Sequence, residues 1–291
     1  MLCRLVRIPR VQESTMSTFP TAAPHTGPSW QAQPGLAVQT VLTDDAGGAY
    51  RISVYAPPGP APARGWPVLL WLDDEFADLA WALWRHHAQG RKGPVIAPGV
   101  LVSVGYPGAS RREQDYVPAL AGAGGGRADA FRRFLFDDVL PQVAAGWPLD
   151  PDTLALGGHS LGGLFVLDTL LRAPERAHAW LAISPSVWWG DGHLARLADS
   201  VPAQAHGPVL VYVGEHEQGL SPAEATLAAD ARERLAAHRG ARRMVDGARE
   251  FVQALARGEA LQPRFTCIAG EGHRSLVPRA LDLALRGLYG R

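Results

Sequence analysis

The sequence predicts an α/β fold with a mostly parallel central sheet, helices on both faces and an antiparallel N-terminal hairpin. Three observations predict it. Short β-rich segments alternate with longer helical patterns from residue 36 onward, several of the β-rich segments are apolar throughout, and a turn-like Asp-Asp-Ala-Gly-Gly joins the first pair. At 291 residues, the chain is long enough for one large α/β domain.

The hairpin strands are expected at residues 36–43 and 50–58, and a run of prolines from Pro57 onward ends the second one. Buried strands should follow, with helices in most of the gaps, at residues 68–72, 100–104, 153–158, 179–184, 209–214 and 264–270. Two stretches interrupt this alternation, residues 105–127 and 185–206. We expect the first to be a long loop over the strand ends, where α/β proteins hold ligands, and the second to be another long loop.

Residues 1–34 contain Ser, Thr, Pro and Gln with little periodicity, so we expect a flexible leader before one folded unit at residues 35–291. Met16 is an alternative start of translation. Three arginines interrupt the short apolar stretch of the leader, which argues against a secretory signal. No later apolar run reaches the ~18 residues of a membrane span. The sequence therefore predicts a cytoplasmic protein and leaves its oligomeric state open.

Charge and cysteine content exclude several classes of function. Lys plus Arg and Asp plus Glu both total 28, so no long-range field would attract nucleic acid or an acidic membrane surface. The two cysteines, Cys3 and Cys267, offer neither a disulfide framework nor metal-ligand spacing. We expect neither a metal site nor an organic cofactor.

The strand predicted at residues 153–158 leads into Gly158-His159-Ser160-Leu161-Gly162, and an apolar helical pattern follows. G-x-S-x-G between a strand and a helix is typical of the nucleophile elbow of the α/β-hydrolase fold, where a sharp turn lifts the serine Oγ above the sheet. Glycines on both sides let the neighbouring backbone approach. Ser160 is the candidate nucleophile, and the N–H of Leu161 is a candidate oxyanion donor at the helix N-terminus. An incidental serine in a glycine-rich turn is the alternative.

A serine nucleophile needs an adjacent base, and this fold places its histidine late in the chain. Of the ten histidines, His273 lies directly after the last predicted strand and before the last helix. His159 belongs to the elbow, and we expect its side chain to be packed aside. His273 is therefore the candidate base.

An acid should follow a strand between Ser160 and His273, to orient the imidazole. Glu217 lies 57 residues after Ser160 and 56 residues before His273. Glu215 is the rival, and the absence of any acid is a third alternative.

The second oxyanion donor should come from the loop after the third strand, where the backbone N–H of Glu75 or Asp74 is the candidate. We expect the carboxylates of Asp73 and Asp74 to form the turn and to cap the next helix rather than to take part in chemistry.

Together these segments resemble the esterase family that includes esterase D, the mycolyl-transferring antigen 85 proteins and the ferric enterobactin esterases. The resemblance covers roughly residues 36–290. It is carried by WLDDEFAD, VGYPGASRREQDYVPA, DAFRRFLFDDVLPQV, GGHSLGGLF, AISPSVWW and VGEHEQ, which look most like the siderophore-hydrolysing branch. The resemblance implies substrate contacts at four positions, which are Tyr106, Arg112, Trp188 and Trp189.

The branch pattern also includes Asp115 and Tyr116, with an ion pair between Arg112 and Asp115 as the structural alternative. This chain has Asp73-Asp74 where the family has Asp-Gly, which leaves the width of the oxyanion loop open. No obvious basic cluster for a charged catecholate is evident beyond Arg85, Arg111, Arg112 and Arg127.

These features predict a serine carboxylic ester hydrolase whose preferred substrate is a siderophore trilactone, with or without its iron, or a similar aromatic ester. The alternatives are a general short-chain acyl esterase, an S-formylglutathione hydrolase-like thioesterase, an acyltransferase, and a non-catalytic binding protein on the same fold.

Overall fold

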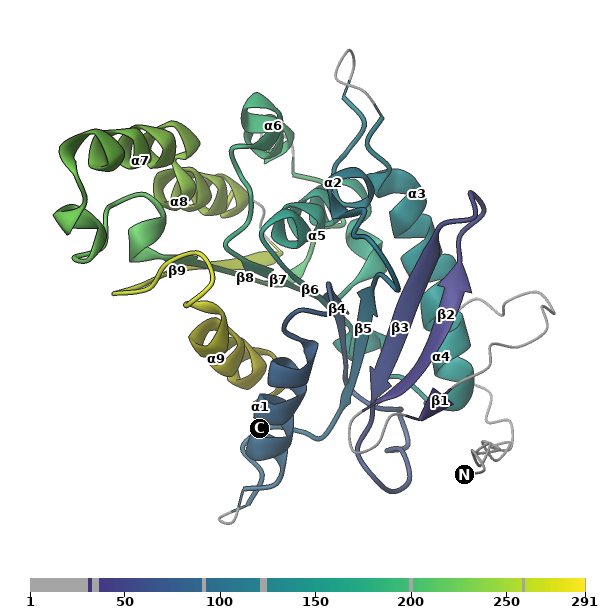
Figure 1. The fold of residues 1–291 in the computed structure, drawn as a ribbon. Coiled ribbons are helices and arrows are strands. Elements are labelled where there is room, and N and C mark those ends of the chain that lie inside the picture. The colour runs from purple at the N-terminus through teal and green to yellow at the C-terminus, as the bar shows by residue number, and fades with distance from the viewer. Residues whose placement is uncertain are drawn as a thin grey trace.

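The structure is a computed structural model that describes residues 31–32, 37–90, 93–120, 125–198, 201–257 and 260–290. Apart from Gln31–Ala32, the expected leader lies outside the described residues, and so do Met16 and Leu36. Within the described part, nine strands form one sheet in the order β1-β2-β3-β5-β4-β6-β7-β8-β9 (Figure 1). Their bounds are β1 (Gln31–Ala32), β2 (Val38–Thr43), β3 (Ala49–Tyr55), β4 (Val68–Leu72), β5 (Val100–Gly105), β6 (Ala155–His159), β7 (Ala179–Ile183), β8 (Gly207–Gly214) and β9 (Leu261–Ile268).

The antiparallel part of the sheet lies at its N-terminal edge. β2 pairs with β3 from Val38↔Val54 to Thr43↔Ala49, and β3 pairs antiparallel with β5. The turn closes because Asp44 Oδ1 accepts hydrogen bonds from the N–H groups of Ala46 (3.1 Å) and Gly48 (2.7 Å). A short polar side chain that accepts from the backbone two residues on is how aspartate makes a turn. The predicted hairpin is confirmed.

The remaining neighbours, from β5 through β4 and β6 to β9, pair in parallel. Every residue of β4, β5, β6 and β7 is buried, because helices cover both faces of this part of the sheet. β8 and β9 begin earlier than predicted, at Gly207 and Leu261, since backbone pairing between the two extends beyond their apolar runs. The α/β-hydrolase fold predicted from the sequence is confirmed.

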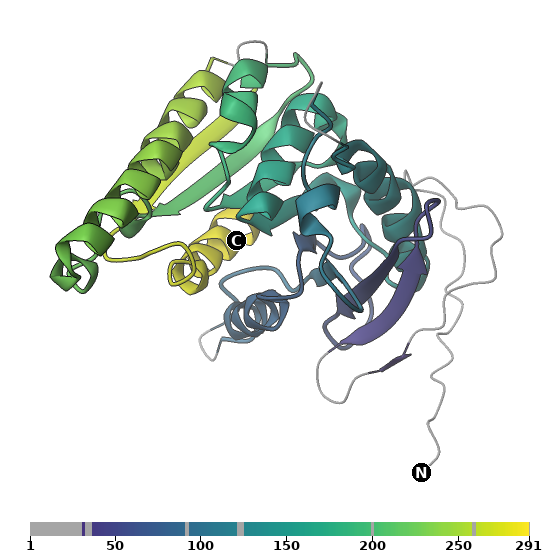
Figure 2. The same ribbon diagram turned by 45° about the horizontal axis from the view of Figure 1, so that its top comes forward.

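Helices form one layer on each face of the sheet (Figures 1 and 2). One layer consists of α1 (Ala77–Ala88) and α9 (Val277–Tyr289), whose apolar residues share one core cluster. The other layer holds α3 (Ala128–Arg133), continued through the π-helical turn η1 (Phe134–Val139) into α4 (Leu140–Gly146), and also α5 (Leu161–Arg172), α6 (Trp189–Ala198) and α8 (Met244–Leu255). The shorter elements are α2 (Arg112–Asp115), η2 (Pro151–Thr153), η3 (Pro174–Arg176), η4 (Glu215–Glu217) and η5 (Glu224–Thr226). None of the residues of α7 (Ala229–Arg242) is buried.

A buried ionic cluster holds the segment after β7 against the helical layer. Asp168 of α5 is fully buried and contacts Arg132 of α3 (2.6 Å), Arg172 (2.9 Å) and His193 of α6 (2.8 Å). Burial opposes ionisation, but the hydrogen bond from His193 and the two guanidinium charges lower the pKa of Asp168 below its ordinary value. Within the predicted loop at residues 185–206, residues 189–198 form α6, which is kinked at Gly190–Gly192 and is fixed to α5 through His193. Residues 199–200 lie outside the described part.

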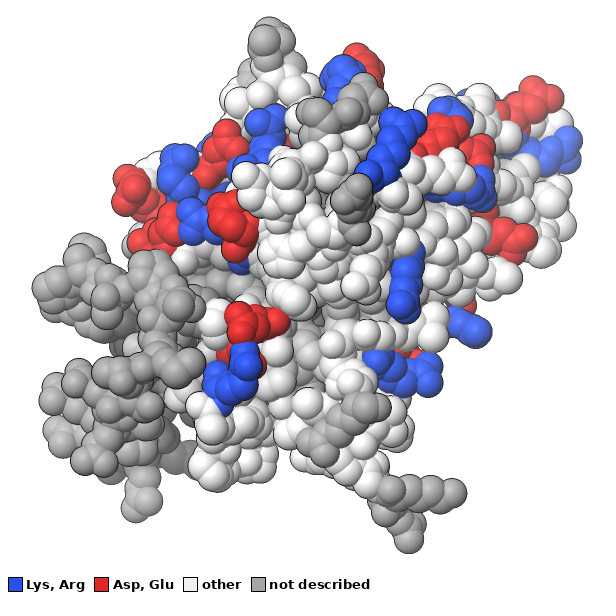
Figure 3. All heavy atoms as spheres, turned by 180° about the vertical axis from the view of Figure 1, so that it is seen from behind, with Lys and Arg blue, Asp and Glu red and all other residues white. Residues whose placement is uncertain are grey.

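Charges of both signs are interspersed on the face seen in Figure 3, and neither sign gathers into one large patch. This distribution agrees with the formal net charge of +0. No helix in the described part of the chain combines the length and apolar character needed to cross a membrane.

Candidate active site

Ser160 lies at a strained turn between β6 and α5. Its φ of 61° and ψ of −116° are values that only a tightly determined backbone imposes on a residue with a side chain. A Cβ at Gly158 would lie 2.6 Å from the carbonyl carbon of Gly162, so the first glycine of the motif is needed for close approach. At Gly162 a Cβ would make only ordinary contacts, whereas at Gly163 it would lie 3.0 Å from Pro185 Cα. The second tight position is thus one residue later than the motif indicates.

The predicted base and acid meet at the carboxyl ends of neighbouring strands. His273 follows β9, Glu217 follows β8, and His273 Nδ1 lies 2.7 Å from Glu217 Oε2. Because a carboxylate only accepts, Nδ1 carries the proton and the free lone pair of the imidazole is on Nε2. Glu215 instead accepts a hydrogen bond from the N–H of Gly270 (2.8 Å). Of the two candidate acids, the one in contact with His273 is Glu217.

The Glu217 carboxylate is held by two further donors. Its Oε1 accepts from the N–H of Gly214 (2.6 Å) and from the hydroxyl of Ser184 (2.6 Å), and its side chain is only 1% exposed. Ser184 is fully buried and has a positive φ of 46° directly after β7. The resemblance places Ser184 at the start of the aromatic wall, but the sequence did not predict its contact with Glu217. Its place at the end of a buried strand, followed by a proline, was the available signal.

His159 is a second residue whose role the sequence did not reveal. Its Nε2 lies 2.7 Å from the backbone carbonyl oxygen of His273, and the two rings are 4.6 Å apart between centroids. Burial and the neighbouring His273 lower the pKa of His159 to about 4. The ring is therefore neutral near pH 7 and donates Nε2–H to the carbonyl, which can only accept. The side chain is buried and packs against Phe76, and in addition it couples the elbow to the His273 loop.

The loop after β4 bears one of the two predicted oxyanion donors, the backbone N–H of Glu75 or Asp74. Asp73 has a φ of 77°, and Ala77 N–H bonds to the carbonyl of Asp74, so the chain turns sharply here. Leu161 is the first residue of α5, and the N–H groups of the first helical turn lack intrahelical acceptors. The Glu75 side chain pairs with Arg274, which follows His273, so this loop and the His273 loop are linked by an ion pair.

The carboxylates of Asp73 and Asp74 do not cap α1, so that expectation was wrong. The residue before α1 is Phe76, and no side chain hydrogen-bonds to this helix start. The Asp74 carboxylate accepts hydrogen bonds from Arg51 (2.8 Å) and Ser103 (3.1 Å). It occupies the space beside Gly105, where a Cβ would lie 2.2 Å from Asp74 Cγ. The departure from Asp-Gly is accommodated by turning this carboxylate toward β3 and β5.

Arg112 joins the oxyanion loop to the elbow. It donates to the backbone carbonyl of His159 (3.1 Å) and lies 3.3 Å from Asp73 Oδ2. The alternative ion pair with Asp115 does not form, because Asp115 is fully buried against other residues. Its carboxylate accepts from the hydroxyls of Tyr50 (3.0 Å) and Tyr106 (3.2 Å).

The remaining residues predicted to contact substrate differ in their exposure to solvent. Tyr106 is only 6% exposed and Tyr116 is fully buried, so both brace the loop from within. Trp188 is 37% exposed, with the guanidinium of Arg242 stacked 4.5 Å from its ring centroid. Trp189 packs partly against the core. The N–H of Ser186 bonds to the carbonyl of Ser160 (3.1 Å), so the segment that carries the two tryptophans begins next to the elbow.

The four arginines named from the sequence do not form one basic cluster, which agrees with the expectation that no obvious cluster is present. Arg111 and Arg127 lie within 3.6 Å and 3.5 Å of Asp115, which neutralises part of their charge. Arg85 lies in the C-terminal half of α1, which is the half directed away from the oxyanion loop. Arg112 and Arg274 are the cations adjoining the elbow and the His273 loop.

The model of the family described as "Putative esterase" matches residues 44–266. The chain belongs to this esterase family. It is a carboxylic ester hydrolase, as the sequence predicts. Among curated relatives, the ferri-bacillibactin esterase of Bacillus subtilis is 29% identical over 278 residues, covering 87% of this chain and 89% of the relative. The apo-salmochelin esterase of Escherichia coli is 30% identical over 177 residues, covering 53% and 52%.

Solved structures show the same fold for this esterase. A siderophore hydrolase from Aspergillus nidulans superposes with a TM-score of 0.79 at 23% identity, covering 89% of this chain and 96% of that one. The BES protein from Bacillus cereus gives a TM-score of 0.74 at 24% identity, covering 94% and 100%. At these identities the likeness establishes the architecture, and the site residues rest on the geometry above.

Proposed function

We propose that Ser160, His273 and Glu217 form a catalytic triad that hydrolyses the ester bonds of a siderophore. The observation that carries the proposal is the 2.7 Å contact between His273 Nδ1 and Glu217 Oε2, next to an elbow whose preceding residue bonds to the His273 backbone. This arrangement supplies a nucleophile, a base and an orienting acid from three strand ends.

The proposed reaction begins when His273 Nε2 takes the proton of the Ser160 hydroxyl as Oγ attacks the ester carbonyl carbon. The N–H groups of Leu161 and Glu75 stabilise the negative charge on the tetrahedral oxygen. Protonated His273 then gives its proton to the leaving alkoxide. Water, activated by the same histidine, attacks the acyl-enzyme and releases the carboxylic acid with free Ser160. Glu217 remains ionised throughout and stabilises the imidazolium.

The siderophore assignment is supported by the relatives and by the surroundings of the elbow. Both curated relatives described above are named for siderophore ester hydrolysis. Trp188 presents an exposed aromatic ring that suits planar catecholate groups. Iron would enter as part of the substrate. A cytoplasmic location remains a prediction.

The test compares hydrolysis of enterobactin, with and without iron, with hydrolysis of p-nitrophenyl acetate and butyrate. Wild type, Ser160→Ala and a control, Ser221→Ala, are assayed together. Trilactone cleavage that far exceeds simple-ester cleavage, and that disappears only in Ser160→Ala, supports the proposal. Turnover of simple esters alone would indicate a general esterase. Serine-independent turnover, or failure of a fluorophosphonate to label Ser160, would reject the triad.

A further inference from the structure

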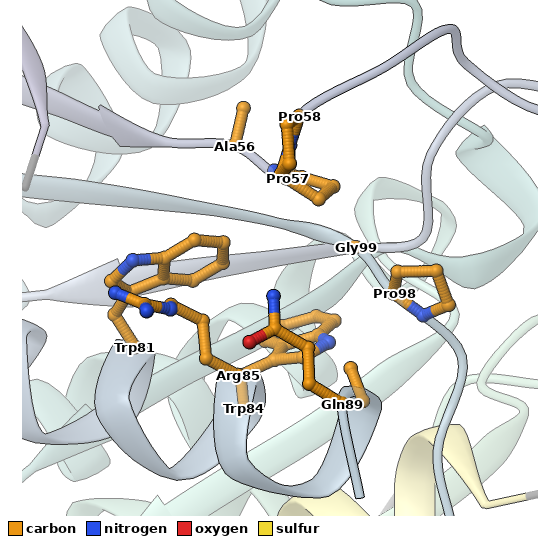
Figure 4. Close-up of a pocket in the computed structure, with 10 residues that line it drawn as sticks. Ala56, Pro57, Pro58, Trp81, Trp84, Arg85, Gln89, Pro98 and Gly99 are labelled. Carbon is orange, nitrogen blue, oxygen red and sulfur yellow. The ribbon is translucent and has the colours of Figure 1, made fainter. Parts of the chain in front are cut away.

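A pocket of about 250 Å³ lies between α1 and the segments that follow β3 and precede β5 (Figure 4). Its walls are aromatic and prolyl rings, with two polar side chains at the rim. The lining comprises Ala56, Pro57, Pro58, Trp81, Trp84, Arg85, Ala88, Gln89, Pro98 and Gly99. The proposed catalytic residues do not contribute to it.

The pocket and the elbow lie at opposite edges of the sheet. Gly99 immediately precedes β5, and Pro57 follows the antiparallel β3, so both lie at the amino-terminal edge of the parallel strands. Ser160 follows β6 and lies at the carboxyl-terminal edge. A ligand in the pocket would therefore leave the esterase site free.

Rigid groups keep this hollow open. A Cβ at Gly99 would lie 2.3 Å from Trp84 Cζ2, so the backbone packs directly on the indole. Trp84 is fixed because its Nε1–H donates to the carbonyl of Ala97 (3.0 Å) and its ring stacks on Tyr289 at 4.4 Å. Proline rings have few rotamers with which to fill the space opposite. The hollow is thus preformed, which lowers the entropic cost of binding.

The electrostatics of the lining favour an anion. Arg85 is exposed, and no carboxylate of the described residues pairs with it. None of the lining residues is acidic. Figure 4 shows the Arg85 and Gln89 side chains reaching from α1 alongside the two indoles. A guanidinium beside aromatic walls can bind a carboxylate through paired hydrogen bonds while a ring contacts the indoles.

We propose that this pocket binds a small carboxylate carried on a single aromatic ring. The volume lies just below the ~300–1,000 Å³ of sites for drug-sized ligands, which limits the occupant to roughly one ring. The ring packs against Trp81 and the prolines, and the carboxylate pairs with Arg85, assisted by the Gln89 carboxamide. The proposal does not depend on the substrate of the esterase site.

The test measures binding of benzoate by calorimetry to protein whose Ser160 has been blocked by a fluorophosphonate. Benzamide, which has the same shape without the charge, is the ligand control. We expect benzoate to bind and benzamide to bind about tenfold more weakly, the difference expected from one charge-assisted hydrogen bond. Absence of benzoate binding to the blocked protein, or equal binding of the two compounds, would overturn the proposal.

Variants locate the binding. Arg85→Gln should weaken benzoate binding about tenfold, whereas Arg133→Gln, an exposed arginine on α3, should leave it unchanged. Ala88→Leu should fill the hollow and abolish binding, and all three variants should retain the wild-type rate of ester hydrolysis. Unchanged benzoate affinity in both Arg85→Gln and Ala88→Leu would assign the bound benzoate to another place on the protein.

Discussion

His159 Nε2 lies 2.7 Å from the backbone carbonyl oxygen of His273, so the residue before the proposed nucleophile is bonded to the proposed base. His159 thus couples the loop after β9 to the elbow after β6, two segments separated by β7 and β8 in the sheet. His273 is therefore held at two points. Its ring Nδ1 contacts Glu217, and its backbone carbonyl contacts His159.

Replacing His159 should impair positioning of the base rather than binding of the substrate. In His159→Phe the carbonyl of His273 loses its donor, so we expect kcat to fall roughly tenfold or more with little change in KM. His159→Gln keeps an N–H donor and should recover most of the rate. Steady-state kinetics of both variants measure this, and equal kcat values for the two would show that the hydrogen bond is irrelevant.

His159 should also make stability depend on pH. An unfolded histidine titrates near pH 6.5, whereas folded His159 takes up a proton only at about 4, because it is buried beside His273. Between these values the unfolded chain binds more protons. This contribution is therefore present in full above about pH 6.5 and is lost as pH falls toward about 4, by at most ~3 kcal/mol.

Urea unfolding at about pH 7.5 and about pH 4.5 measures this dependence. Wild type should lose ~2 kcal/mol more stability between the two conditions than His159→Gln does. The comparison of two differences removes any pH-independent cost of the substitution. Identical losses in the two proteins would contradict the prediction.

Glu217→Gln tests which acid orients the base. The neutral amide cannot stabilise the imidazolium and can offer Nδ1 the wrong partner, so kcat should fall about 10²–10⁴-fold. Glu215→Gln is the matched control two residues away, and it should retain most of the activity because Glu215 bonds to Gly270 rather than to His273. A larger loss in Glu215→Gln than in Glu217→Gln would reverse the assignment.

Asp168→Ala should destabilise the protein by about 3–5 kcal/mol, because it leaves the Arg132 side chain, 9% exposed, without its buried carboxylate partner. Asp230→Ala removes an acid from an (i, i+4) pair whose side chains are 69% and 71% exposed. That control should change stability by ~0.5 kcal/mol or less. Denaturant midpoints measure both losses of stability. Similar losses in the two variants would show that the buried cluster stabilises the fold no more than an exposed ion pair does.

The sequence predicted best what depends on local pattern. Buried strands, the elbow at Ser160 and the placement of His273 follow from apolar runs, glycines and chain order, which are all readable along the chain. Glu217 and Glu215 could not be separated in this way, since the spacing fits both. The short turn after β8 directs Glu217 to the His273 side chain and Glu215 to the Gly270 N–H, both on the loop after β9.

The errors also have physical causes. Arg112 and Asp115 are only three residues apart, but Arg112 contacts Asp73 and the His159 carbonyl, and Arg111 lies against Asp115 in its place. Tyr106 was expected to face the substrate, and its hydroxyl is directed instead at the same buried Asp115. These contacts depend on how β3, β5 and α3 pack against one another. That tertiary arrangement cannot be predicted from a single sequence.

The position of β9 makes catalysis sensitive to an event much smaller than unfolding. β9 is the last strand of the sheet and pairs only with β8 within the described residues, and most of its side chains are at least partly exposed. Edge elements of this kind detach at lower free energy than the strands within a sheet. Because His273, the proposed base, lies on the loop that follows β9, fraying of this one strand would move it away from an elbow that stays fully folded. On mild heating or in dilute denaturant, activity would then be lost before the rest of the fold. The enzymatic rate would thus measure whether β9 is still paired with β8.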